Sequence, residues 1–595
     1  MTQAAEVDFS YNPERLPQKG FGFGKKETYD VAIYVNDASL AGSTVKGISV
    51  PLEAVGSVSA TSAWLSSELR LKKKNGKNVN DPDILIQDGD LSDGTLTVMF
   101  DTPYHVTGPF YAGYSFTVDN LDVEASKTPV AVAEIIDYGG LFIHSSRTKF
   151  KWIDCTEEAQ GVSVMKVLID GDFKDNSASF LPAEGLYVSA EERPLISVDV
   201  INHGMNPISS ITYTYSGPAG SGNGSAEFDP AVAGAFGARK SVEIDLGSVS
   251  CTGTSDLTLD ITSVNGLPNN DVSPQTVMPL KVYPFIPVNR PLVEEYTGLW
   301  CGWCVRGYVA LETMKERYPD QFIGLAYHDG DPMEPVGLER PSFVTGYPSA
   351  FINRNKTKLN ISELYTVWPE FIKTIAPASV DVSISWTDDT KTAIKAVSTS
   401  RFIEDYTNAD FAVCYALIQD DMSDPSWAQY NAYASEENKK DDYPEMPGEL
   451  GKLFTEGPAY VYGLTYNDVV LALPQPSGYP GSVPAAINAG EEIKHSCIIP
   501  IDGIESVKGG NPIQNKSRLR VVASIIDRKT GLSVNCNTSD YIEPMSADLM
   551  ESDDNIRTVI YHDLQGRRIN RPVKGIYIRT SITEKGSITT EKITN

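Results

Sequence analysis

Residues 293–304 place two cysteines, separated by two residues, between a strand pattern and a helix pattern. The stretch reads Val-Glu-Glu-Tyr-Thr-Gly-Leu-Trp-Cys-Gly-Trp-Cys. Apolar residues then recur at helical spacing, at Val305, Tyr308, Leu311, Met314 and Tyr318. This predicts a strand, a turn and a helix that begins at the cysteines. Free N–H groups and the helix dipole at a helix N-terminus favour thiolate over thiol, so the stretch predicts a reactive cysteine pair.

The spacing alone leaves three kinds of site open. A Cys-x-x-Cys pair serves as a redox pair, as half of a zinc site or as a structural disulfide. His328 follows a short apolar run and is a candidate auxiliary residue near the cysteines. Because Cys301, Cys304 and His328 supply only three ligands, we predict no metal site. We also predict no cofactor.

The same stretch resembles the active-site turn of the thioredoxin superfamily, whose usual motif is Trp-Cys-Gly-Pro-Cys. Residues 300–304 match it except that Trp303 replaces the proline. Further on, Gly-Tyr-Pro-Ser at 346–349, followed by apolar residues 350–352, resembles the family's cis-proline turn and the strand after it. Two matches in the right order imply a thioredoxin-like α/β domain.

The thioredoxin resemblance implies roles for three residues. Cys301, the more exposed thiol, would attack a substrate disulfide, and Cys304 would resolve the mixed disulfide. Glu295 stands six residues before Cys301, where the family often places a buried acid that takes the proton of the resolving thiol. Glu294 is the alternative for this role, and an exposed strand-end glutamate is the alternative reading of Glu295.

The resemblance also implies a substrate-binding surface. A cis Pro348 would expose the backbone of Tyr347 to an extended substrate segment. Trp300 and Trp303 are the other candidate substrate-binding residues. Trp303 occupies a position that tunes the redox potential in relatives, so reductase, oxidase and isomerase all stay open.

Residues 290–540 resemble the Omp28-related outer-membrane proteins of Bacteroidetes. The resemblance rests on segments 294–298, 326–333 and 346–353. Residues 559–578 resemble the C-terminal sorting domain of type IX secretion substrates, although His562 is inserted in its Tyr-Asp pairing. Together they imply an extracytoplasmic protein, secreted or attached to the outer membrane surface. No signal segment is visible at the start, so we expect that the native one is not part of this sequence.

Composition narrows the partners. The net charge of −28 argues against nucleic acid, which positive fields bind. No run approaches the roughly 20 apolar residues of a membrane-spanning helix, so we predict no transmembrane segment. Seven cysteines are too few for a disulfide scaffold. We expect the five outside the motif to be buried, with a Cys497–Cys536 bridge as the alternative.

The chain is too long for one core, and most of it alternates with the period of two that is typical of strands. We predict a mainly β, multidomain fold. Its parts are an N-terminal tail (1–20), a β-sandwich (21–177), an Ig-like β domain (178–289), the thioredoxin-like domain (290–376), a jelly-roll-like β domain (377–545) and a C-terminal sorting-like domain (546–595). The polar stretch 420–460 is expected to cover part of the thioredoxin-like face.

Two functions follow from this sequence. The first is a thiol–disulfide oxidoreductase acting on exported proteins or peptides with disulfides or thiols. The second is a surface binding or structural protein in which the thioredoxin-like part is a scaffold and Cys301–Cys304 a static disulfide.

Overall fold

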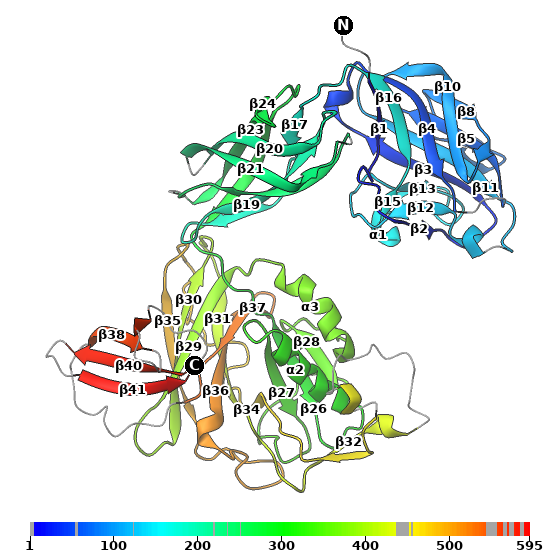
Figure 1. Ribbon diagram of the computed structural model, residues 1–595. Coiled ribbons are helices and arrows are strands. Elements are labelled where there is room, and N and C mark those ends of the chain that lie inside the picture. Colours follow the sequence, from blue (N-terminus) through cyan, green and yellow to red (C-terminus); the bar gives the residue numbers. More distant parts are fainter. Residues whose placement is uncertain are drawn as a thin grey trace. The chain divides into compact units, whose positions relative to one another are not determined.

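The computed structural model describes the chain except residues 1–4, 54–56, 123, 218–219, 235, 250–251, 436–450, 454–455, 543–555, 563–567, 570–575, 584–587 and 595. For Ala5 and the strands after residue 555 it describes the backbone alone. The structure is mainly β and built from several sheets, as predicted (Figure 1). It divides into two compact units, residues 1–286 and 287–595. The division falls within the proline-rich segment 283–291.

The first part of unit 1 is a β-sandwich. One sheet has the order β1 (Ala5–Phe9), β16 (Lys166–Gly171), β4 (Thr44–Pro51), β10 (Thr95–His105), β9 (Leu91–Ser92). The second has the order β14 (Trp152–Asp154), β13 (Phe142–His144), β3 (Thr28–Val35), β11 (Phe110–Val118), β5 (Val58–Ser66), β8 (Leu85–Asp88). Smaller elements are the sheet β15 (Val162–Ser163), β12 (Val130–Ala133), β2 (Gln18–Phe21), the hairpin β6 (Leu71–Lys74), β7 (Lys77–Asn80), and the helices η1 (Ala38–Leu40), η2 (Glu124–Lys127) and α1 (Thr156–Ala159).

Residues 5–9, which we expected to lie in a tail, form strand β1 instead. They pair antiparallel with β16 along their whole length. Val7 is buried in the sandwich core and Phe9 packs against it, so the alternation of these two apolar side chains explains the strand.

The second part of unit 1 consists of two further sheets that enclose their own apolar core. One is β17 (Ala178–Phe180), β19 (Leu195–Asn202), β22 (Arg239–Asp245). The other is β18 (Leu186–Ser189), β25 (Gln275–Tyr283), β23 (Gly253–Val264), β20 (Ile208–Gly217), β21 (Gly220–Val232), with β24 (Leu267–Pro268) beside β23. Two facing sheets with alternating buried residues are what the period-two pattern predicts.

A seven-stranded sheet organises unit 2. Its order is β28 (Ser349–Ile352), β26 (Leu292–Thr297), β27 (Ile323–His328), β34 (Val469–Ala472), β31 (Phe411–Gln419), β36 (Leu519–Asp527), β37 (Leu532–Thr538). Strand β26 pairs parallel with β27 and antiparallel with β28. Strand β27 then pairs parallel with β34. Strands on both sides of residue 376 therefore belong to one sheet.

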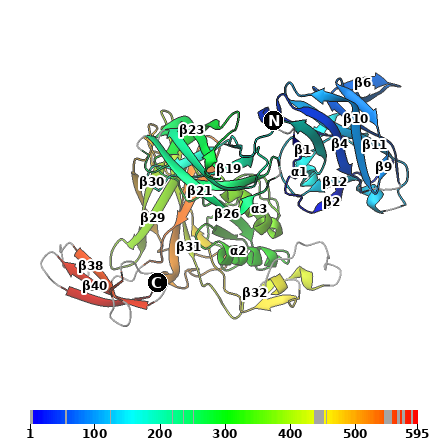
Figure 2. The same ribbon diagram turned by 45° about the horizontal axis from the view of Figure 1, so that its top comes forward.

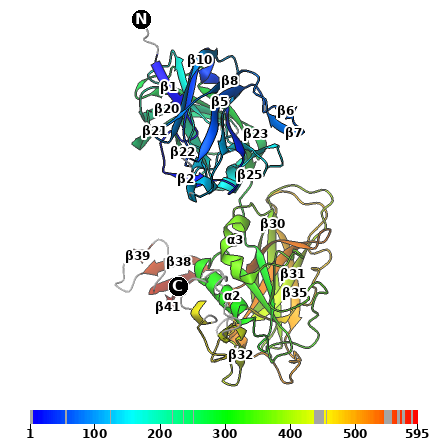
Figure 3. The same cartoon turned by 90° about the vertical axis from the view of Figure 1, so that its right-hand side faces the viewer.

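Helices and a second sheet cover the same face of this sheet. Helices α2 (Val305–Arg317) and α3 (Leu364–Ile372), the latter preceded by η3 (Ile361–Glu363), pack on Val293 and Ala326 and lie next to β26 (Figure 2). The sheet β29 (Ala378–Trp386), β30 (Ala393–Phe402), β35 (Ile493–Pro500) packs on β31, β34 and β36. Ala326 pairs with Val469, and paired residues share a face, so both layers cover one side. Figure 3 shows helices α2 and α3 on one side and β30, β31 and β35 on the other.

The sheet curls so that its first and last strands meet at one end. Cys536 in β37 donates to the backbone oxygen of Arg290, just before β26, at 3.0 Å. Ser533 donates its N–H to the oxygen of Asn353, just after β28, at 3.0 Å. The uncovered face thus becomes the inside of the curl, where Leu292, Leu325 and other apolar residues form a core of their own.

The remaining described elements of unit 2 are short. They are the hairpin β32 (Ala428–Tyr430), β33 (Tyr460–Tyr462), the helices η4 (Ala432–Ala434) and η5 (Lys516–Arg518), and a C-terminal sheet of order β39 (Arg568–Ile569), β38 (Ile556–His562), β40 (Ile576–Thr583), β41 (Ile588–Thr594). The predicted sorting-like domain begins outside the described residues, and its role stays a prediction. No helix in the described part of the chain is long and apolar enough to cross a membrane.

Candidate functional site

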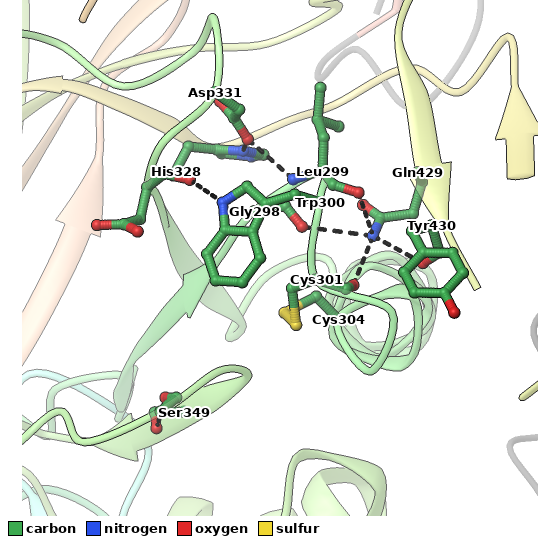
Figure 4. Close-up of a disulfide and its surroundings, with 12 residues drawn as sticks. Gly298, Leu299, Trp300, Cys301, Cys304, His328, Asp331, Ser349, Gln429 and Tyr430 are labelled. Carbon is green, nitrogen blue, oxygen red and sulfur yellow. Dashed lines mark hydrogen bonds and ion pairs between the residues drawn. A yellow bond between two sulfur atoms is a disulfide. The ribbon is translucent and has the colours of Figure 1, made fainter. Parts of the chain in front are cut away.

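The two cysteines of the motif lie where β26 passes into α2, as predicted. Cys304 is the N-cap residue of α2, and Cys301 lies in the turn before it. Their sulfur atoms are at disulfide distance, 2.33 Å, with the Cα atoms 5.3 Å apart (Figure 4). The turn is closed by backbone hydrogen bonds from Cys301 N–H to Gly298 and from Cys304 N–H to Cys301.

Both cysteines are buried, whereas the tryptophans of the motif are exposed. Cys301 has 5 % of its surface exposed and Cys304 none. Cys301 is thus the more accessible of the two, as expected, but by a small margin. Trp300 is 52 % and Trp303 39 % exposed.

The predicted proline turn lies beside the cysteine turn. The Tyr347–Pro348 peptide bond is cis, as the resemblance implied. Tyr347 makes an edge-to-face contact with Trp300, with ring centroids 5.5 Å apart. The Arg340 guanidinium donates a hydrogen bond to the Tyr347 hydroxyl at 2.8 Å. The two turns therefore meet through an aromatic pair at the surface.

A segment from the polar stretch 420–460 lies over the cysteine turn, as expected for its described part. The side-chain amide of Gln429 donates to the backbone oxygens of Cys301 at 3.1 Å and of Gly298 and Leu299 at 3.4 Å. The N–H groups of Tyr430 and Ala432 donate to Leu299 and Gly302. We call residues 429–432 the clamp segment. No sequence pattern singled out Gln429 as a residue that would hold this turn.

Gly302 is required by this packing. A Cβ atom at this position would lie 2.7 Å from the ring of Tyr430 and 2.8 Å from the Cβ of Ala432. Such distances are too short for real contacts, so a larger residue would push the clamp segment away from the cysteines.

Glu295, the predicted proton acceptor, is buried on the helix side of the sheet. Only 1 % of it is exposed, and among the described residues its Oε1 atom has no hydrogen-bond partner. Burial raises the pKa of Glu295 to about 7, against the smaller opposing effects of His328, Thr297 and Arg306. The alternative reading as an exposed glutamate is therefore wrong.

Gly307 in α2 makes the room for this carboxyl group. A Cβ atom at residue 307 would lie 1.7 Å from Glu295 Oε1. Gly307 follows Cys304 by three residues, and residues at that spacing share a helix face. The Glu295 carboxyl thus lies against the same side of α2 that carries Cys304. Its neighbour Glu294 points to the other face, because successive strand residues alternate.

His328 lies at the end of β27 and is held by Asp331. Its Nδ1 atom lies 2.7 Å from Asp331 Oδ2, which also accepts the N–H of Leu299 at 3.0 Å. Burial raises the pKa of Asp331, but His328 and the backbone N–H groups of Leu299 and Met333 outweigh it and hold the pKa below its usual value. A cavity of about 20 Å³ between Glu295, His328 and Gln429 has the size of a single water site.

The other described cysteines are free and buried, at 155, 414, 497 and 536. The alternative of a Cys497–Cys536 bridge is therefore wrong in this structure. Burial raises the pKa of Cys497 to about 11 and that of Cys155 to about 12, so these thiols stay protonated near neutral pH. Cys251 lies outside the described residues. Within the described residues, no group of three or more His, Cys, Asp and Glu side chains is arranged to hold a metal ion.

Comparison with known proteins gives weak resemblances alone. No family model matches the sequence. No curated protein matches it. Solved structures similar to this chain include HBP35 of Porphyromonas gingivalis, at 14 % identity over 52 % of this chain and 99 % of that chain, with a TM-score of 0.29. They also include a domain of the outer membrane lipoprotein Omp28 from Porphyromonas gingivalis, at 14 % identity over 29 % of this chain and 93 % of that chain, with a TM-score of 0.15. These scores are too low to carry an argument about activity.

The raised pKa of Glu295 makes stability depend on pH. Between pH 4.5, its ordinary pKa, and about 7, folded Glu295 keeps a proton that the unfolded chain has lost, so the free energy of unfolding falls as pH rises. Glu295→Gln should therefore stabilise the protein by up to roughly 3 kcal/mol at pH 8, and change little at pH 4.5. Urea unfolding followed by tryptophan fluorescence at both pH values measures this. Glu316→Gln, an exposed site on α2, is the control. An equal effect of Glu295→Gln at both pH values would contradict the burial argument.

The fit between Gly307 and Glu295 is tested by Gly307→Ala. Alanine normally favours a helix by about 1 kcal/mol over glycine. Here the new methyl group collides with the carboxyl, and we expect a net loss of about 1–3 kcal/mol. In a Glu295→Ala background the collision is absent, so the same change should be neutral or stabilising. Unfolding free energies of the four proteins in this double-mutant cycle measure the coupling. Additive effects would show that the two residues do not compete for space.

Proposed function

We propose that this chain is an extracytoplasmic thiol–disulfide oxidoreductase acting on exported proteins or peptides. One observation carries the proposal: the Cys301–Cys304 pair stands at the N-terminus of α2, beside a cis proline, with the buried Glu295 carboxyl against the same helix. A scaffold has no need of all three together. The sorting-like pattern of residues 559–578 supports export.

The proposed reaction passes two electrons from the cysteine pair to a substrate disulfide. The Cys301 thiolate attacks one substrate sulfur, a mixed disulfide forms, and the other substrate sulfur leaves as a thiolate. Cys304 gives its proton to the ionised Glu295 carboxylate and attacks the sulfur of Cys301. The second substrate thiolate leaves, and the Cys301–Cys304 disulfide remains. Substrate oxidation is the same sequence in reverse.

Glu295 suits the proton transfer because its pKa, about 7, lies near neutral pH. The carboxyl exists in both protonation states there, so it can accept a proton when Cys304 attacks and return it in the reverse direction. The exposed Trp300 ring and the half-buried Tyr347 ring, together with the Tyr347 backbone beside the cis proline, would form the substrate-binding surface. His328 would act on Glu295 through their shared cavity.

The proposal is tested by the redox equilibrium of the cysteine pair with glutathione and by reduction of a disulfide-bonded peptide. We expect a potential within about −120 to −270 mV and loss of the activity in Cys301→Ser. Cys497→Ser, which removes a free cysteine of the same unit, is the control and should keep the activity. A bond that is reduced only below about −300 mV, or a Cys301→Ser protein as active as the wild type, would reject the enzyme.

The clamp segment favours a second function, a surface binding or structural protein with a static disulfide. It covers the cysteine turn and leaves 5 % of Cys301 exposed, which restricts attack by a protein thiol. In this reading the disulfide fixes the start of α2 and takes no part in exchange.

A substitution that loosens the clamp segment distinguishes the two proposed functions. Gln429→Ala removes the amide bonds to the cysteine turn, and we expect reduction of the disulfide by a small dithiol to become roughly three to ten times faster. If the protein is an oxidoreductase, turnover of a peptide disulfide should change as well. Gln475→Ala, in an exposed loop, is the control. An unchanged reduction rate in Gln429→Ala would show that the clamp does not limit access.

A further inference from the structure

Unit 2 contains a second cavity, much larger than the one beside Glu295. Its volume is about 1080 Å³, within the range of small-molecule sites. Its lining includes Glu294, Tyr296 and Tyr327 from the inside of the curled sheet, and Arg354 from the end of β28. The rest comes from residues 355–356 and from segments 335–343, 471–476, 499–505 and 530–532. None of the described cysteines lines it.

The deepest polar groups of this cavity are an ion pair. Glu294 is 5 % exposed, and its Oε1 accepts the Tyr327 hydroxyl at 3.0 Å and lies 3.5 Å from Arg354 Nε. Arg354 also donates to the backbone oxygen of Pro476 and, at 3.6 Å, to Cys414 Sγ. Among the described residues nothing hydrogen-bonds to Glu294 Oε2, and this atom is not sealed from solvent. It is therefore an acceptor that a ligand in the cavity can reach.

The lining of the cavity combines apolar side chains with a net negative charge. The rings of Tyr296 and Tyr327 stack at 4.7 Å with 12° between their planes. Aliphatic and aromatic side chains, among them Leu338, Phe343 and Leu473, line the space around them. Four carboxylates border the cavity, at 294, 339, 502 and 505, against the two cations Arg354 and Lys356. This balance favours a ligand that carries positive charge.

We propose that the cavity binds an amphipathic ligand with a cationic nitrogen head group, an amine or a guanidinium, on an apolar body. The head group donates to Glu294 Oε2, and the body lies over Tyr296 and Tyr327. A buried ion pair seldom adds stability over apolar residues of the same shape, so a bound partner accounts better for a carboxylate at this depth. The head group belongs either to a free amine or to a lysine or arginine side chain of an apolar peptide segment. The site is separate from the proposed thiol chemistry.

Calorimetric titration of the full chain tests the ligand class. The cationic probes are 4-phenylbutylamine and the blocked tetrapeptide Leu-Lys-Phe-Leu. Their anionic counterparts are 4-phenylbutyrate and Leu-Glu-Phe-Leu. We expect the cationic probe of each pair to bind at least about tenfold tighter. If Leu-Lys-Phe-Leu binds more tightly than 4-phenylbutylamine, the head group belongs to an apolar peptide segment. If the amine binds at least as tightly as the peptide, the head group belongs to a free amine. No binding of either cationic probe at about 1 mM, or equal binding of the anions, would overturn the proposal.

Variants locate the site. Glu294→Gln keeps the shape of the side chain and the hydrogen bond from Tyr327. It should lower the affinity for the cationic probes at least about tenfold. Val336, 63 % exposed where it lines the cavity, allows Val336→Arg without disturbing the core, and this change should weaken them similarly. Glu316→Gln is the charge-matched control. The double variant Cys301→Ser, Cys304→Ser should bind as the wild type does, whether or not the protein is an oxidoreductase. Wild-type affinity in both Glu294→Gln and Val336→Arg would overturn the proposal.

Discussion

Burial of two neighbouring carboxylates in one strand is the constraint around which unit 2 is arranged. Glu294 and Glu295 are 5 % and 1 % exposed, and alternation sends them to opposite faces of the seven-stranded sheet. A buried carboxyl group needs either a partner or a proton. The structure uses one solution on each face. Glu294 is paired with Arg354 and Tyr327, whereas Glu295 lies in space left by Gly307 with a pKa near 7.

These two solutions have different chemical consequences. The carboxyl group on the inner face is paired with Arg354 and Tyr327 and keeps one acceptor atom for a ligand, which suits recognition of a cation. The carboxylate on the helix face has a mobile proton and lies against the helix that begins at Cys304, which suits proton transfer during thiol exchange. Glu294 and Glu295 are consecutive residues of β26, yet one suits binding and the other suits proton transfer. The sheet lies between their carboxyl groups and keeps the two environments apart.

The sequence was informative where a local pattern determines the structure. The strand, cysteine turn and helix at 293–318 and the cis bond before Pro348 follow from short motifs, and so does the mainly β character. Pairing between distant segments was not predictable in this way. Strand β27 pairs with β34, which lies more than 140 residues later in the chain. Period-two alternation does not say which strands are neighbours in a sheet. For the same reason the sequence did not single out Arg354, Gly307 or Gln429, whose importance comes from residues that fold against them.

The pairing of β27 with β34 also means that the cysteine site does not depend on residues 290–376 alone. Asp468, next to the pairing residue of β34, forms ion pairs with Lys315 of α2 at 2.6 Å and with Arg520 of β36 at 2.9 Å. Arg520 pairs with Asp420 as well, at 2.6 Å, so this largely buried cluster joins the helix to strands β31, β34 and β36. Residues 429–432, which also follow β31 in the sequence, cover the cysteine turn. The surroundings of the Cys301–Cys304 turn are therefore built in part by residues beyond 410, and the proposed thiol exchange would depend on the whole unit.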